Sequence, residues 1–339
     1  MASAGRAIAG AAVTVAAALV LFLAFRGHGG TPPPAAAGTV PGGIAPASAA
    51  AGSAAEASRP AAGVPGQAPA GSAQPSAAAR ASSSRGEGPA PAGHADPLAG
   101  AAASYVAGRS GTVLAAVYDV STGQSWRLGD GPGQAEASVV KLDVLEALLA
   151  RQGDAPLSPG DQSLARAMIE DSDNDSATSL WDEAGGPAGI GSYNGEAGLT
   201  KTTPSECVVC PGFPWPGWGL TTTVPYDQLT LLKQLITPGP RPLLTQAERS
   251  YALSLMENVT PDQRWGISGG VPAGVTVALK NGWLPLNDAN TDWQVNSVGW
   301  VSGDGRDYLA AVFTTGNPTE QYGIDTINAL SSIIWTAMR

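Results

Sequence analysis

The sequence predicts an α+β domain, in which one antiparallel sheet is built from both ends of the domain and a helical insert lies between them. Three observations lead to this fold class. Segments that alternate, or that are rich in β-branched residues, occur near residue 112 and again after residue 273. The segments between them have the apolar spacing of helices. A further amphipathic helix follows the last expected strand.

The expected elements follow in order along the chain. Residues 112–120 form a first strand, and "SWRLG" returns after the turn "STGQ" as the second strand of a hairpin. Start signals and apolar faces predict helices over residues 138–151, 158–172, 174–184, 186–198, 224–236 and 245–259. Three consecutive antiparallel strands are expected over residues 274–283, 293–303 and 307–316, and a closing helix over 320–338. The intervening loop 199–223 is rich in Pro and Trp, and a loop of this length is more often functional than idle.

The chain preceding this domain has two parts. Residues 7–25 are apolar between Arg6 and Arg26, a length of about 28 Å as a helix, close to the hydrocarbon thickness of a bilayer. We favour a retained anchor, residues 1–26, over a cleaved signal peptide, whose apolar part is usually shorter. No cysteine lies near it, so lipid attachment there is unsupported. Residues 27–97 are mainly Ala, Pro, Gly and Ser, which predicts a disordered tether.

The remaining residues, 98–339, are enough for one substantial core, which we expect to lie outside the cytoplasm, either membrane-anchored or secreted. This part has 13 Lys and Arg against 25 Asp and Glu. This acidic balance disfavours nucleic acid as a partner, because phosphate binding needs clustered Lys and Arg. We expect the domain to act as a monomer.

The cysteines and histidines limit the chemistry that the domain can perform. Cys207 and Cys210 are the only cysteines, and outside the cytoplasm this pair favours a small loop disulfide over a zinc site. Both histidines, His28 and His94, fall in the expected tether. We therefore expect no metal or organic cofactor, and a hydrolase here would need a base other than histidine.

Three short polar motifs carry the functional hypothesis. In chain order they are Ser138-x-x-Lys141, Ser172-Asp173-Asn174 and Lys280-Asn281-Gly282. Each alone is weak evidence, since a helix cap, a solvated lysine or a turn explains it. Together, their order and context resemble the S-x-x-K, S-D-N and K-T-G motifs of the penicillin-recognising serine hydrolases. Only four lysines lie in residues 98–339, and two of them occupy motif positions.

The likeness is greatest to class A β-lactamases and covers essentially residues 100–339. It includes the hairpin before Ser138, the "GG" after the S-D-N helix, a "TTT" opening the next helix, and "AVFTTG" before the terminal helix. The resemblance implies a mixed β-lactamase/transpeptidase-like fold. It also implies a serine hydrolase whose substrates are β-lactam amides or related cell-wall peptides.

The resemblance implies a division of labour among the residues of the three motifs. With no histidine available, the hydroxyl of Ser138 needs a nearby base, and Lys141 can serve if desolvation and neighbouring cations lower its pKa. Ser172 would pass a proton to the leaving nitrogen. Lys280 would help it and attract a substrate carboxylate. Asn174 can bind an acylamino group of the substrate.

Other positions have supporting roles under the same hypothesis. Asp173 is expected to brace its loop rather than react. By analogy with the family, the oxyanion donors are the backbone N–H groups of Ser138 and Trp283. Gly282 lets the strand edge come close to substrate. Trp283 is also the better candidate for the rim of the cleft.

Two positions depart from the family pattern. Asn281 stands where a Thr or Ser is usual, which reshapes the floor of the site and leaves the substrate preference open. Glu206 is the only acid in the loop that supplies the deacylating glutamate in class A enzymes, and its surroundings do not match the family's. It is either the general base or a solvent-facing carboxylate. Phe213, Trp215 and Trp218 in the same loop either line the substrate site or pack the loop onto the domain.

Three functions follow from this reading of the sequence. The leading hypothesis is an exported hydrolase that forms an acyl-enzyme at Ser138 and hydrolyses β-lactams. The alternatives are a D,D-peptidase or esterase-like enzyme acting on cell-wall peptides, and a non-catalytic domain that binds β-lactams or wall fragments.

Overall fold

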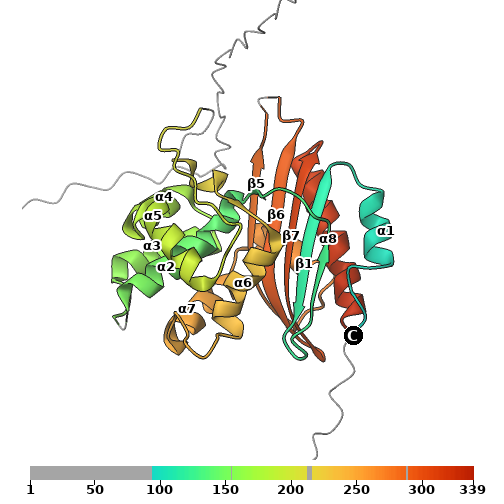
Figure 1. Ribbon diagram of the computed structural model, residues 1–339, viewed down its shortest axis with the longest axis horizontal. Coiled ribbons are helices and arrows are strands. Elements are labelled where there is room, and N and C mark those ends of the chain that lie inside the picture. The colour runs from blue at the N-terminus through green and yellow to red at the C-terminus, as the bar shows by residue number, and fades with distance from the viewer. Residues whose placement is uncertain (1–93, 154, 212–215, 288) are drawn as a thin grey trace, which may run out of the picture. The chain divides into compact units, whose positions relative to one another are not determined.

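A five-stranded antiparallel sheet forms the centre of the fold, with strand order β2-β1-β7-β6-β5 (Figure 1). The computed structural model describes residues 94–153, 155–211, 216–287 and 289–339. The strands of the sheet are β1 (Thr112–Asp119), β2 (Ser125–Leu128), β5 (Thr276–Pro285), β6 (Trp293–Gly303) and β7 (Arg306–Asn317). The α+β fold class expected from the sequence is confirmed.

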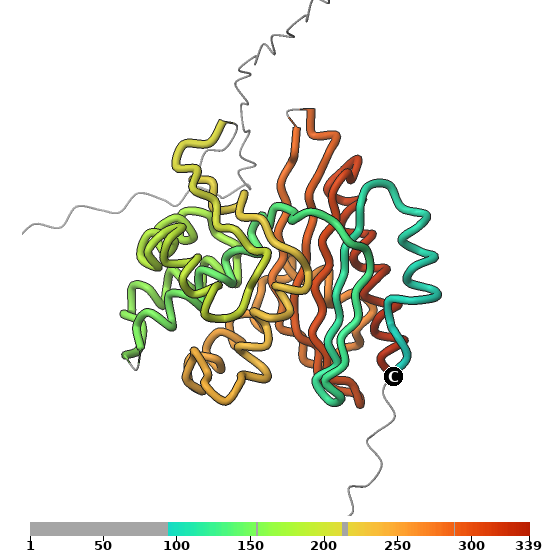
Figure 2. The backbone as a smooth tube through the Cα atoms, in the orientation of Figure 1, coloured from blue at the N-terminus to red at the C-terminus, as the bar shows by residue number. Residues whose placement is uncertain are grey.

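The sheet joins the two ends of the domain through one pair of strands. β1 pairs with β7 along its whole length, from Thr112 opposite Thr315 to Asp119 opposite Tyr308. Figure 2 shows the early strand lying beside the late ones, with the helical segment outside the pair. Strands from the beginning and the end of the domain therefore share one sheet, and the helices between them form an insert, as the sequence predicts.

Helices cover both faces of the sheet (Figure 1). The insert consists of α2 (Val140–Gln152), α3 (Pro159–Glu170), α4 (Asn174–Glu183), α5 (Gly186–Ala197), α6 (Pro225–Ile236) and α7 (Gln246–Glu257). The other face is covered by α1 (Ala101–Ala107) and α8 (Glu320–Ala337). Two further short strands, β3 (Gln134–Ala135) and β4 (Thr222–Thr223), pair with each other beside the start of α2.

The alternation of side chains along β5 separates two apolar cores. Ala278 belongs to the core shared with the helical insert, whereas Val277 and Leu279 belong to the core under α8. Because successive side chains of a strand point to opposite faces, Lys280 faces the insert and Asn281 faces α8. This alternation decides which residues of the third motif can reach the other two motifs.

The beginning of the domain differs from the expectation in two details. α1 was not expected, because its residues, "AAASYVA", have no clear apolar period. His94, expected in the tether, is hydrogen-bonded through Nδ1 to the Asp119 carboxylate at 2.8 Å. The expected anchor and most of the expected tether lie outside the described residues. Within the described ranges, no helix combines the length and apolar character needed to cross a bilayer.

Arg306 links the hairpin between β6 and β7 to the end of α8. Its side chain is 2% exposed, its Nε donates to the Trp335 carbonyl at 2.9 Å, and its guanidinium lies 3.9 Å from the centroid of the Trp335 ring. Its Nη1 also donates to the carbonyl and carboxylate of Asp304 at 2.8 and 2.7 Å.

We expect Arg306→Met to lower the free energy of unfolding by about 2 kcal/mol or more, because buried carbonyl groups lose a charged donor. The matched control is Arg166→Met, which removes an exposed pair with Glu170 one helical turn away and should cost less than about 1 kcal/mol. Urea denaturation of both variants measures the difference. Equal losses would contradict a stabilising role for Arg306.

Candidate active site

Ser138 lies in a 3-10 turn, Ala137–Val139, that runs directly into α2. This places Ser138 and Lys141 on adjacent turns of one continuous helical segment. Ala137 has a φ of +52°, the left-handed region that a residue with a side chain adopts at a cost. Ser138 is partly buried, and among the described residues its hydroxyl has no hydrogen-bond partner. The nucleophile candidate is therefore held by its backbone, with its hydroxyl unengaged.

Ser172 connects the two motif lysines. Lys280 Nζ donates to the Ser172 hydroxyl oxygen at 2.9 Å, and Lys141 Nζ lies 3.2 Å from the same oxygen. Lys141 Nζ also donates to the Ser172 carbonyl at 2.5 Å and to Asn174 Oδ1 at 2.7 Å. The three motifs, far apart in the sequence, thus meet around one hydroxyl group.

The loop before α4 presents Ser172 to both lysines. Ser172 has a φ of +58°, a second non-glycine residue in the left-handed region. The Asp173 carboxylate caps α4 by accepting from the Ser176 N–H at 2.7 Å. Asp173 is therefore placed to brace the loop, and Asn174, the first residue of α4, points its amide oxygen at Lys141.

Both lysines have an environment that favours the neutral amine. Lys141 and Lys280 are 0% and 1% exposed, and no carboxylate of the described residues forms an ion pair with either. Burial lowers the pKa of Lys280 to about 7. Burial, and then the nearby charge of Lys280, lower the pKa of Lys141 well below its ordinary value, against the opposing effect of the Asp173 charge. A neutral Lys141 at neutral pH is able to accept a proton.

Gly282 packs against the backbone that carries Ser138. A Cβ atom at residue 282 would lie 2.6 Å from Ser138 N and 2.7 Å from both Glu136 O and Val139 N. Real Cβ atoms do not approach backbone this closely, so only glycine fits here without movement. This contact places β5 beside the start of the helix, with the backbone of Trp283 next along the strand.

Two other residues of the third motif region lie on the opposite face of the sheet. The Asn281 side chain is 1% exposed, and its Nδ2 donates to the carbonyls of Gln263 and Trp265 at 2.7 and 3.1 Å. The Trp283 ring packs on that of Trp265, with centroids 5.9 Å apart. The structure therefore does not bring the Asn281 amide or the Trp283 ring to Ser172. Strand alternation explains both differences from the expectation, because Lys280 and Gly282 already face the insert.

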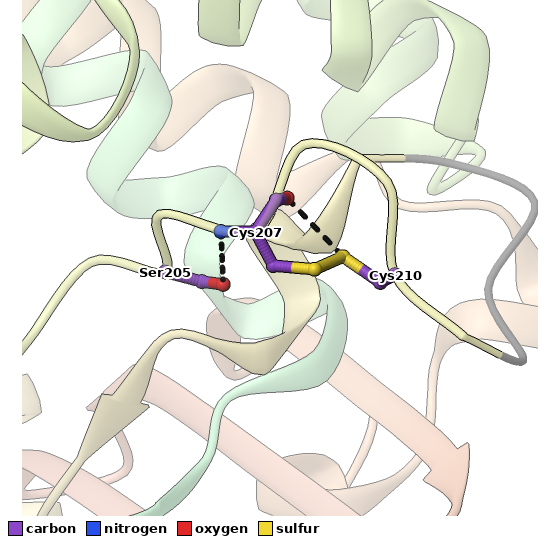
Figure 3. The surroundings of a disulfide bond; sticks show 3 residues. All are labelled: Ser205, Cys207 and Cys210. Carbon is purple, nitrogen blue, oxygen red and sulfur yellow. Dashed lines mark hydrogen bonds between the residues drawn. A yellow bond between two sulfur atoms is a disulfide. The ribbon is translucent and has the colours of Figure 1, made fainter.

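The loop after α5 is shaped by a disulfide. Cys207 and Cys210 are joined, and the Cys207 N–H donates to the Ser205 hydroxyl at 3.3 Å (Figure 3). The Cys207 carbonyl accepts from the Gly217 N–H at 2.7 Å. Glu206 is exposed on this turn and has no hydrogen bond within the described part of the chain. Phe213 and Trp215, expected to line the site or to pack the loop, lie outside the described residues.

Among the described residues of this loop, Trp218 reaches Lys141. It is 6% exposed, its ring centroid lies 5.1 Å from Lys141 Nζ, and its Nε1 donates to the Thr178 hydroxyl at 3.2 Å. The sequence indicated an aromatic loop but could not rank its aromatic residues. In the described part of the loop, the structure places the indole of Trp218, and no carboxylate, beside Lys141.

Comparisons with known proteins agree with this fold. The sequence profile described as "Beta-lactamase enzyme family" matches residues 160–338, a range that includes Ser172 and Lys280 and begins after α2. The "Putative lipoprotein LppW" of Mycobacterium bovis and that of Mycobacterium tuberculosis are each 30% identical over 219 residues. This match covers 61% of the chain and 64% of the relatives, less than two thirds of their length.

Solved structures with the same architecture include β-lactamases and a penicillin-binding protein. The TLA-1 extended-spectrum β-lactamase has a TM-score of 0.59 at 17% identity, covering 69% of this chain and 95% of its own. A class A β-lactamase from Mycobacterium abscessus has a TM-score of 0.55 at 22% identity, covering 69% and 96%. PBP-A has a TM-score of 0.57 at 22% identity, covering 69% and 93%. At these identities the likeness establishes the fold.

We expect Gly282→Ala to lower the free energy of unfolding by about 1–3 kcal/mol, because the added methyl group collides with backbone at Ser138. The control is Gly195→Ala on α5, where an added Cβ meets nothing within 4 Å and should stabilise the helix by about 0.5–1 kcal/mol. Denaturation curves of the two variants give the comparison. A neutral Gly282→Ala would mean that β5 is free to move away from Ser138.

Proposed function

Because this chain belongs to the beta-lactamase enzyme family, we propose that it is an exported serine enzyme that forms an acyl-enzyme at Ser138, with β-lactam amides as its substrate class. The observation that carries the proposal is the Ser172 hydroxyl, placed between the buried amines of Lys141 and Lys280. A solvated lysine or a simple helix cap explains neither the burial of both amines nor their common partner.

The proposed acylation divides among four side chains. The neutral Lys141 amine takes the proton from the Ser138 hydroxyl, and Oγ attacks the lactam carbonyl carbon. A bond from Oγ to that carbon forms and the bond from the carbon to the lactam nitrogen breaks. The Ser172 hydroxyl passes a proton to the leaving nitrogen and is replenished from the lysines that contact it. The oxyanion is stabilised by the backbone N–H groups of Ser138 and Trp283.

Lys280 supports the choice of substrate class. Its ammonium form, present below about pH 7, attracts the carboxylate that β-lactams and acyl-D-alanyl peptides share. Asn174 keeps its amide nitrogen for the substrate, because its oxygen already accepts from Lys141. Asn281 has no part in this binding scheme, since both hydrogens of its amide are bonded elsewhere.

We further propose that the acyl-enzyme is long-lived. Hydrolysis of the ester needs a water molecule and a base beside Ser138. The indole of Trp218 occupies the region next to Lys141, and Glu206 is exposed on the disulfide turn. Both observations favour a protein that is acylated by penicillin and turns it over slowly.

An extracytoplasmic location is part of the proposal. The apolar segment 7–25 and the disulfide support export. The relatives named lipoproteins also support a position at the membrane. In this chain the two cysteines lie in the folded part, so we propose that the apolar segment holds the protein there.

A D,D-peptidase acting on cell-wall peptides is the second candidate function. Slow loss of a β-lactam acyl group is compatible with it, because a natural acyl group can leave by transfer to an amine. Product analysis after incubation with a muropeptide separates the two candidates. A purely binding role is less well supported, since a binding site has no need for two buried lysines around a serine hydroxyl.

We expect a fluorescent penicillin to label the wild-type protein covalently, with a mass increase equal to that of the intact penicillin. Ser138→Ala should remove the label completely, because the ester oxygen is lost. Lys280→Ala should slow labelling by roughly a hundredfold, as expected for loss of a proton-transfer and binding group. Equal labelling of wild type and Ser138→Ala would refute acylation at this serine, as would no labelling of either.

The lifetime of the acyl-enzyme tests the role of Trp218. We expect Trp218→Ala to admit water beside Lys141 and to speed deacylation about tenfold or more. Trp218→Phe keeps a ring in place and should keep the wild-type lifetime. Loss of label after a chase with unlabelled penicillin measures the rate, and thermal unfolding checks that both variants are folded. The same decay in Trp218→Ala as in wild type would exclude this role.

A further inference from the structure

Three carboxyl groups are buried beneath the segment that carries Ser138. Glu136 precedes the serine by two residues, and Asp143 and Glu146 lie on α2; each is 0% exposed. No lysine, arginine or histidine of the described residues forms an ion pair with them. Three uncompensated charges at this depth would be very costly. Protons must therefore be bound within this group.

The hydrogen bonds indicate where one proton lies. Asn194 Nδ2 donates to Asp143 Oδ1 at 2.9 Å, and the Tyr193 hydroxyl donates to Glu146 Oε2 at 2.7 Å. The carboxyl groups of Glu136 and Asp143 are close enough to influence each other's titration. Both oxygens of Glu136 and Oδ2 of Asp143 are buried and receive no hydrogen bond from any described donor. Two buried, neighbouring carboxyl groups without other donors avoid repulsion and gain a partner if one of them is protonated, so we infer that this pair shares a proton.

The groups that surround the pair keep that proton in place. Asp227 on α6 adds a negative charge near Glu136. Tyr193 on α5 is hydrogen-bonded to Glu146 and is also influenced by the charges of Asp143 and of Glu248 on α7. Burial, followed by the charge of Asp143 and then that of Asp227, raises the pKa of Glu136 well above its ordinary value.

The pKa of Asp143 is shifted in the same direction as that of Glu136. Burial raises its pKa to about 6, against the effects of Glu136, Asn194 and Gln228, which lower it. Raised pKa values on both members are expected when two buried carboxyl groups share one proton.

Two hydrogen bonds hold the backbone of Glu136, in addition to the contacts of its side chain. Its N–H donates to the Thr221 carbonyl at 2.8 Å, and its carbonyl accepts from Asn296 Nδ2 at 3.0 Å. The next residue is Ala137, with its φ of +52°, and then comes Ser138. The Glu136 backbone thus connects the Ser138 turn to Thr221, the residue before β4, and to β6. The Glu136 side chain connects the same turn to α2.

We propose that Glu136 is a positioning residue for Ser138, acting through the proton that its carboxyl group shares with Asp143. The kinetic part of this inference rests on the proposed function. The shared proton holds the turn at Ala137 against α2 and so fixes the hydroxyl of Ser138 relative to Lys141. Loss of that proton puts two negative charges in contact inside the protein and pushes Glu136 away from α2.

The direction of the pH effect follows from proton binding. The folded protein keeps a proton that the unfolded chain releases above the ordinary pKa of glutamic acid. Stability from the pair is therefore fully present below that ordinary pKa and is lost as the pH rises through the raised pKa of the folded state.

The experiment compares three variants of the full chain. Glu136→Gln supplies a permanent hydrogen-bond donor to Asp143, whereas Glu136→Met fills a similar volume without one. Glu257→Gln, on the exposed end of α7, is the control for loss of a carboxylate. The second-order rate of penicillin acylation is measured from about pH 6 to about pH 9, with the thermal midpoint at each pH. Infrared spectra record the C=O band of a protonated carboxyl group.

We expect Glu136→Gln to acylate like wild type near pH 6, and Glu136→Met to be slower by roughly tenfold to a hundredfold. The ratio of the wild-type acylation rate to the Glu136→Gln acylation rate should fall as the pH rises, because only the wild type loses the shared proton. Titration of Lys280 affects both proteins and therefore cancels in this ratio. The infrared band should weaken in Glu136→Gln and persist in Glu257→Gln.

The experiment distinguishes failure of the proposed function from failure of the positioning role of Glu136. A wild type that penicillin never labels overturns the proposed function, and with it the kinetic role of Glu136. A labelled wild type overturns the positioning role alone if Glu136→Met reacts as fast as wild type, or if the rate ratio does not change with pH. A folded Glu136→Gln that retains the full infrared band overturns the shared proton.

Discussion

The arrangement of this site depends on burying two lysine amines around one serine hydroxyl. An ammonium group loses most of its hydration in such a place, and no carboxylate of the described residues forms an ion pair with Lys141 or Lys280. The protein responds with neutral acceptors, namely the hydroxyl and carbonyl of Ser172 and the amide of Asn174. These groups accept a hydrogen bond from either form of the amine, so each lysine can change protonation state without losing its position.

Backbone strain at two points serves that arrangement. Ala137 and Ser172 both have positive φ values, and each turns the chain at the place where a reactive side chain enters the site. The surrounding contacts compensate for this cost. Asp173 caps α4 immediately after one turn, and the Glu136 backbone is hydrogen-bonded to β6 immediately before the other.

Much of the fold was predictable because the spacing of apolar residues within each short segment indicates whether that segment forms a helix or a strand. Alternation identified the strands, and apolar spacing with Pro, Ser and Gly signals identified the six helices of the insert. The three motifs identified Ser172 and Lys280 as neighbours because their chemistry requires them to meet. The α1 helix was missed because its alanine-rich sequence has no apolar face to recognise.

The errors within the site arise from what sequence spacing does not encode. Alternation alone would have put Asn281 and Trp283 opposite Lys280, but the motif was interpreted as a unit rather than as a strand. Trp218 could not be separated from the other aromatic residues of its loop without knowing how the loop folds back on Lys141. The carboxyl groups of Glu136 and Asp143 resemble ordinary helix-surface acids in the sequence, and only tertiary packing buries them.

The pairing of β1 with β7 also constrains how the protein is made. Thr112 cannot pair with Thr315 until the helical insert and strands β5 and β6 have been synthesised. The central sheet is therefore completed late. A nascent chain with this topology remains without its finished sheet throughout translation. Under the proposed export, that delay suits passage through a secretion channel as an extended chain, with folding and oxidation of the cysteines following on the far side.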